Sequence, residues 1–211
     1  MANCVLSILE DPEFWGKLAE LEALFYPYCL ALNTLQKNKA RLFEVLHCFG
    51  YFMEQTLSNP DDDFKDNMVL RLEKRWLAWE QPLLLLSFYL HPLYKLEWFS
   101  RSENITSSKL SQWIYYYFVK WFGEEPNTIV QELLAYKSMK YPFNDPLLKK
   151  LENIPLDYWS WINDQTPNLS MFCSKLFSIC VNSAGCERLF SSMGFFHTKR
   201  RNPLGVSIVT V

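Results

Sequence analysis

Apolar residues recur at steps of three and four along nearly the whole chain, and this spacing constrains the fold more than any other feature of the sequence. The first strong series consists of Phe14, Leu18, Leu21, Leu24, Phe25 and Tyr28. A period near 3.6 places such residues on one face of an α-helix, whereas a half-buried strand requires strict alternation. We find no convincing alternating strand, and only 206–211 has a β-branched composition. The pattern predicts an all-α fold of about nine helices.

Cap residues and prolines divide this pattern into elements. Asp11-Pro12 has the chemistry of a helix start, and Pro27 should kink or divide the helix that follows. A second helix is expected over 39–57. Further helices are expected up to about residue 80, over 83–90, from Ser107 or Ser108 to residue 122, over 128–140, and after Thr166-Pro167 and Asn182-Ser183. Residues 155–161 are expected to form an aromatic turn.

The acidic run 61–63 allows two interpretations, a helix cap and a metal site. It directly precedes a predicted helix, where the helix dipole favours negative charge. Consecutive aspartates in this position are much more often a solvated cap than a set of ligands. We therefore predict a cap.

The apolar run 83–90 predicts a helix that is buried on all sides. It is too short to cross a bilayer, so no membrane contact is expected. The chain is 49% hydrophobic and contains 16 Phe, 11 Tyr and 8 Trp. Such a density of aromatic residues favours a bulky helical core and, in some proteins, an exposed patch that binds a partner.

Charge and cysteine content limit the possible functions. The formal net charge is −2, which lacks the basic excess of a strong nonspecific binder of nucleic acid. The 6 cysteines include no C-x-x-C pair, and no zinc-finger spacing is present. We expect reduced thiols in an intracellular protein, with no metal site formed by this chain alone.

The segment 183–194 predicts a short helix with two distinct faces. Its apolar face carries Cys186, Leu189, Phe190 and Met193. Glu187 lies on the adjacent face, among small and polar residues. Small residues let another backbone, or DNA, come close to this face. A simpler interpretation is also open, in which Glu187 only caps the helix start and Arg188 pairs locally.

Several short motifs along the chain resemble those of one family. They are Phe14-Trp15 with Leu18, Leu21 and Pro27; Arg75-Trp76; Leu90-His91-Pro92-Leu93-Tyr94; Tyr158-Trp159; Pro167-Asn168-Leu169; Ser183 with Glu187-Arg188-Leu189-Phe190-Ser191; and Arg201-Asn202 with Leu204. Their order resembles the C-terminal half of hAT-superfamily DNA transposases, the hobo and Activator class. The block around Glu187 is the most specific of them.

The resemblance implies a nuclease mechanism for full-length relatives. Two Asp from an RNase H-like sheet and one Glu from a later helix hold two divalent ions, and that Glu matches Glu187. Two ions about 4 Å apart activate water and stabilise the leaving oxygen, and one acid cannot hold them. We expect the sheet, both Asp and the amino-terminal zinc finger to lie upstream of Met1. The chain alone should therefore not be an enzyme and should need no cofactor, with Mg²⁺ or Mn²⁺ bound only if another segment completes the site.

The resemblance further implies two regions, a helical insertion-like region over 1–126 and a C-terminal dimerisation region over 127–211. The expected function is association with itself or with a related transposase chain in the nucleus. The residues expected to serve dimerisation and packing are Leu169, Phe172, Leu176, Leu189, Phe190 and Met193.

Two alternatives stay open at this point. One is a remnant that completes a metal-dependent transposase in trans, with Glu187 as the third acid. The other is a DNA-binding helical module without catalysis. Its nucleic-acid candidates are Lys199, Arg200 and Arg201.

Overall fold

The computed structural model describes residues 9–79, 81–94 and 105–196, and it is all-helical over this part of the chain. The elements are α2 (Pro12–Leu35), α3 (Leu42–Leu57), α4 (Asp62–Ala78), α5 (Gln81–Tyr89), α6 (Ser107–Phe122), α7 (Ile129–Lys137), the 3₁₀ helix η2 (Pro146–Leu151), α8 (Pro155–Trp161), α9 (Pro167–Ser178) and α10 (Ala184–Phe196). Among the described residues the only β-type pairing is an isolated bridge between Arg41 and Cys180. The predictions of an all-α fold and of about nine helices are confirmed.

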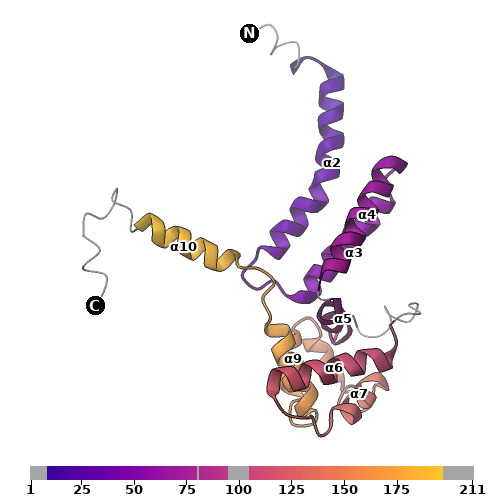
Figure 1. The fold of residues 1–211 in the computed structure, drawn as a ribbon, viewed down its shortest axis with the longest axis vertical. Coiled ribbons are helices and arrows are strands. Elements are labelled where there is room, and N and C mark those ends of the chain that lie inside the picture. Colours follow the sequence, from indigo (N-terminus) through magenta and orange to yellow (C-terminus); the bar gives the residue numbers. More distant parts are fainter. Residues whose placement is uncertain (1–8, 80, 95–104, 197–211) are drawn as a thin grey trace.

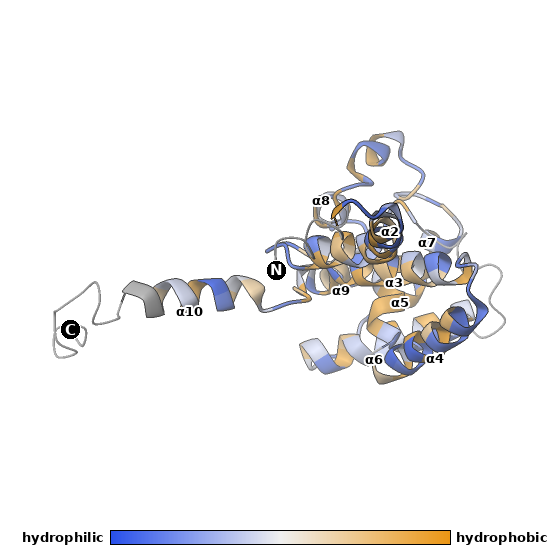
Figure 2. Ribbon diagram, turned by 90° about the horizontal axis from the view of Figure 1, so that it is seen from above, coloured by the Kyte–Doolittle hydropathy of each residue, from blue (hydrophilic) through white to orange (hydrophobic). Residues whose placement is uncertain are grey.

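Helix α5 lies at the centre of the helical body, as the apolar run 83–90 predicts. It packs against α3, α6 and α9, and Figure 2 shows it between α3 and α6. Leu84, Leu85, Leu86 and Leu90 are all buried. A helix that is apolar all round has no face to offer to water, so neighbours must cover it on every side.

The carboxyl end of α5 is also buried, and side chains from two later helices satisfy its free carbonyl groups. The Tyr136 hydroxyl donates to the Tyr89 carbonyl at 2.9 Å, and the Trp159 indole N–H donates to the Leu90 carbonyl at 3.1 Å. The last carbonyls of a helix have no partner inside the helix and are costly to bury unpaired. These two hydrogen bonds therefore fix α7 and α8 against the end of α5.

One hydrophobic core unites the elements from α5 to α9. Its largest fully buried side chains include Trp159, Tyr158, Phe118, Phe172 and Phe177. The core contains residues from both sides of position 126, where the sequence suggested a boundary between two regions. The division of the chain into regions 1–126 and 127–211 therefore stays a prediction.

The amino-terminal helices extend away from this body. Helix α2 packs on α3, and α3 packs on α4, while the far end of α2 projects outward (Figure 1). Pro27 is buried inside α2, which continues through it to Leu35. The helix is therefore not divided, although Figure 1 shows it bending along its length. Packing of this part of α2 on α3 offsets the backbone hydrogen bond that proline cannot donate.

The predicted helix starts are partly confirmed. The Asp11 side chain accepts from the Glu13 N–H, and Asp61 accepts from the Phe64 N–H at 3.0 Å, so the acidic run acts as a cap. The start of α6 was predicted at Ser107 or Ser108, but Thr106 supplies the capping oxygen. Residues 155–161, expected as a turn, form α8.

Candidate association surface

Helix α10 projects from the helical body as an arm. In Figures 1 and 2 it points away from every other labelled helix. Leu189, Phe190 and Met193 are 59%, 69% and 46% exposed. These three residues and the exposed Cys186 lie at i, i+3, i+4 and i+7, so the predicted apolar face exists and is uncovered.

Residues 178–183, which precede α10, contact the loop between α2 and α3 (residues 36–41). We call residues 178–183 and these contacts the clasp. The Val181 N–H donates to the Ala40 carbonyl at 3.3 Å, next to the bridge between Arg41 and Cys180. The Asn182 side-chain amide donates to the carbonyls of Leu35 and Lys37. The clasp therefore fixes the point from which α10 departs.

The first turn of α10 contacts the same loop. Arg188 donates to the Gln36 carbonyl at 3.3 Å and to the Asn38 side-chain oxygen. A Cβ added at Gly185 would lie 3.1 Å from that oxygen, closer than most real contacts allow. Arg188 thus bonds to residues about 150 positions away in sequence, and its interpretation as a locally paired side chain is wrong.

The start of α10 is capped as predicted by residues 182 and 183. The Asn182 side-chain oxygen accepts from the Ala184 N–H at 2.9 Å, and the Ser183 carbonyl accepts from the Glu187 N–H at 2.9 Å. The exposed Glu187 carboxylate accepts from the Ser183 hydroxyl at 2.5 Å. No group of three or more potential metal-ligating side chains occurs among the described residues. A role of Glu187 as a third catalytic acid stays a prediction.

The predicted dimerisation residues fall into two groups. Leu169, Phe172 and Leu176 on α9 are fully buried and belong to the core, so in this fold they pack and are not accessible to a partner. Leu189, Phe190 and Met193 on α10 form the exposed group. The periodicity identified both faces correctly but could not tell which of them the chain itself covers.

A buried carboxylate that the sequence analysis missed holds α9 in place. Glu132 on α7 is only 5% exposed, and its carboxylate accepts from the backbone N–H groups of Leu169 at 2.6 Å and Asn168 at 3.3 Å. Thr166, the predicted cap, makes no cap hydrogen bond and instead donates its hydroxyl to the Ile162 carbonyl. Glu132 therefore caps α9 from another helix, where the dipole also favours its charge.

His91 is a packing residue. It is 3% exposed and lies against the rings of Phe43, Tyr94 and Phe177. Its Nδ1 accepts from the Leu93 N–H at 3.2 Å. Burial lowers the pKa of His91 from 6.5 to about 4, so the ring is neutral at pH 7.

Two further expectations concern nucleic-acid binding and membrane contact. Lys199, Arg200 and Arg201, the nucleic-acid candidates, lie outside the described residues. None of the described helices combines the length and the apolar content needed to cross a bilayer.

Comparison with known families tests the resemblance directly. Residues 137–210 match the family profile described as the hAT family C-terminal dimerisation region. Over these residues the chain is similar to the hAT family C-terminal dimerisation region, as the resemblance implies. The matched segment contains η2, α8, α9 and α10, so both the buried and the exposed candidate residues lie in this dimerisation region. Neither a search of curated proteins nor a search of solved structures gave a match.

We predict that Glu132→Ala lowers the free energy of unfolding by about 1–3 kcal/mol, because the buried Leu169 N–H and the partly buried Asn168 N–H at the start of α9 lose their acceptor. Urea unfolding followed by circular dichroism measures the change. Glu124→Ala, which removes an exposed carboxylate shortly before α7, is the matched control and should have little effect. Equal loss in both variants would contradict the assignment of Glu132 as the cap of α9.

We predict that His91 makes the folded state less stable in acid. The unfolded chain binds a proton at this ring near pH 6.5, whereas the folded protein binds it only near pH 4. Stability attributable to His91 is therefore fully present above pH 6.5 and falls as the pH drops toward 4, by up to about 3 kcal/mol. Urea unfolding at pH 7 and at pH 4.5 should show this loss in the wild type and a smaller loss in His91→Asn. An equal loss in both proteins would refute the prediction.

Proposed function

We propose that this protein associates with a second copy of itself, or with a related hAT chain, through the apolar face of α10. The observation that carries the proposal is the exposure of Leu189, Phe190 and Met193 inside a segment that belongs to a dimerisation region. Fully burying one such side chain contributes about 1.5–3 kcal/mol. A single helix face that leaves three of them in water is a site from which association can gain free energy.

The clasp supports this proposal because it gives the arm a fixed origin. Hydrogen bonds from Asn182 of the clasp and from Arg188 of α10 to residues 35–37 hold the start of α10. A helix anchored at one end loses less orientational freedom on binding than a free segment does. The arm is therefore a partly preorganised docking element.

We further propose that the chain is not catalytically competent alone. In support, the Glu187 carboxylate accepts a hydrogen bond from the neighbouring Ser183 hydroxyl, and no cluster of metal-ligating side chains surrounds it in the described part of the chain. Two divalent ions need several carboxylate oxygens.

We expect the purified chain to leave supercoiled plasmid DNA intact in Mg²⁺ or Mn²⁺ buffer, because one carboxylate cannot hold two ions. Agarose gel electrophoresis separates nicked from supercoiled plasmid. Glu187→Ala serves as the control for contaminating nucleases. Nicking by the wild type that disappears in Glu187→Ala would overturn the proposal.

We predict that the wild type is a dimer and that Phe190→Asp is a monomer, because a carboxylate cannot be buried at an apolar contact without a partner. Size-exclusion chromatography with light scattering gives the mass in solution. Leu134→Asp is the matched control: Leu134 is 62% exposed on α7, outside the matched segment, and this variant should stay dimeric. A monomeric wild type at high micromolar concentration would refute self-association.

A further inference from the structure

We propose that a small pocket between α3, α4 and α5 binds a methylated lysine side chain presented by another protein. The pocket, which we call the α3–α4 pocket, is lined by Leu46, Phe49, Met53, Glu73, Trp76 and Leu85. Its size, the aromatic rings in its wall and the carboxylate at its mouth support this ligand. The inference is independent of association through α10, because no residue of α10 lines the pocket.

The size of the α3–α4 pocket suits a single side chain. Its volume is about 240 Å³, whereas cavities that enclose a whole drug-sized ligand usually measure about 300–1,000 Å³. Leu85 in its lining is 8% exposed, and Glu73 is exposed. The pocket therefore extends from solvent to the buried helix α5, so that one side chain can enter while the rest of its chain stays outside.

Aromatic rings form part of the wall. The ring centroid of Phe49 lies 5.5 Å from that of Trp76 and 5.4 Å from that of Trp79, which follows α4. Trp76 is partly exposed and Trp79 is 38% exposed, so both indoles keep ring surface that a ligand can reach. The faces of such rings attract a cation within about 6 Å, and quaternary ammonium groups are bound by clusters of them.

The Glu73 carboxylate adds a negative charge at the mouth of the pocket. The positions three and four residues away from it on α4 are all apolar: Val69, Leu70, Trp76 and Leu77. No lysine or arginine can therefore pair with it at the usual helical spacing. No ion pair within the described part of the chain involves Glu73. Its charge is thus available to a cationic ligand.

The lining favours a methylated lysine over an unmodified one. Apart from Glu73, every side chain that lines the pocket is apolar. An unmodified lysine ammonium group has three N–H donors, which are costly to bury without acceptors. A trimethylammonium group keeps the positive charge, has no N–H to satisfy, and presents methyl groups to the apolar wall.

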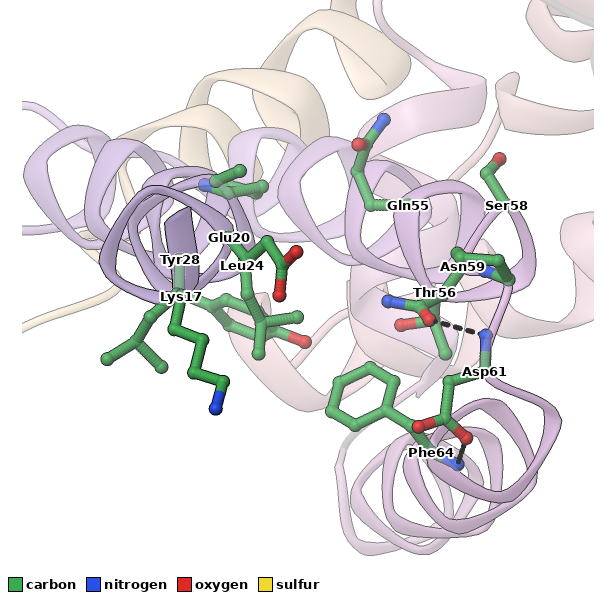
Figure 3. A pocket seen from close by; sticks show the side chains of 14 residues that line it. Lys17, Glu20, Leu24, Tyr28, Gln55, Thr56, Ser58, Asn59, Asp61 and Phe64 are labelled. Carbon is green, nitrogen blue, oxygen red and sulfur yellow. Dashed lines mark hydrogen bonds between the residues drawn. The ribbon is translucent and has the colours of Figure 1, made fainter. Parts of the chain in front are cut away.

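A larger cavity elsewhere supplies a matched control. It lies between α2 and the α3–α4 turn (residues 58–61), has a volume of about 690 Å³, and is more polar: Figure 3 shows Lys17, Gln55 and Asp61 around it. The charge of Lys17 disfavours a second cation there. Glu20 belongs to this lining and is exposed, as Glu73 is in the α3–α4 pocket.

Saturation-transfer difference NMR of the purified chain with Nα-acetyl-trimethyllysine amide tests the proposal. We expect transfer to the N-methyl signal, and an affinity at least about tenfold lower for the unmethylated derivative. Trp76→Leu keeps an apolar side chain but removes the ring, and should weaken binding by about fivefold. Glu73→Gln should weaken it by about threefold. Glu20→Gln should bind like the wild type. Circular dichroism verifies that each variant folds.

Four outcomes would overturn the inference. The first is absence of binding by the wild type, which would leave the proposed association through α10 unaffected. The second is equally tight binding of the neutral tert-butyl isostere of trimethyllysine, because the pocket would then select only apolar surface. The third is a loss of binding in Glu20→Gln but not in Glu73→Gln, which would place the ligand in the larger cavity. The fourth is tighter binding of free choline, which would assign the pocket to a small molecule.

Discussion

The structure depends on the complete burial of α5. This short helix is apolar on all sides, so it is stable only when α3, α6 and α9 enclose it. Enclosure brings the end of the helix into the interior, where its carbonyls need donors that water cannot provide. Tyr136 and Trp159 supply them from helices that lie 47 and 69 residues further along the chain. The apolar composition of α5 thereby requires contacts across most of the helical body.

The segment 137–210, which matches the hAT dimerisation region, is divided by this core. Its part up to α9 is enclosed, with Phe172 stacked on Trp121 at a centroid distance of 5.0 Å, whereas α10 lies outside. The clasp connects these two environments, because it follows α9 directly and fixes the start of the arm to the loop after α2. The start of the arm is therefore anchored to the loop after α2, and its apolar face lies outside the core.

The sequence predicted features that depend on neighbouring residues and missed those that depend on distant ones. Burial of 83–90, the Asp11 and Asp61 caps and the face of α10 all follow from local spacing. The cap of α9 does not, because Glu132 lies 37 residues before Leu169 and resembles any exposed helical glutamate in sequence. Similarly, the apolar faces of α9 and α10 have the same periodicity, and only the tertiary fold decides that one is covered and the other is not. The 3₁₀ helix η2 begins at Asp145-Pro146, which has the same cap chemistry as Asp11-Pro12, and the sequence analysis missed this signal.

The energetics of association explain why an exposed arm needs an extended partner surface. Complete burial of Leu189, Phe190 and Met193 contributes at most about 1.5–3 kcal/mol each, and part of their surface is already buried. Association itself costs about 4–15 kcal/mol in lost freedom of motion. One arm alone is therefore close to the threshold, so association through α10 is favoured only where further apolar area is buried together with it.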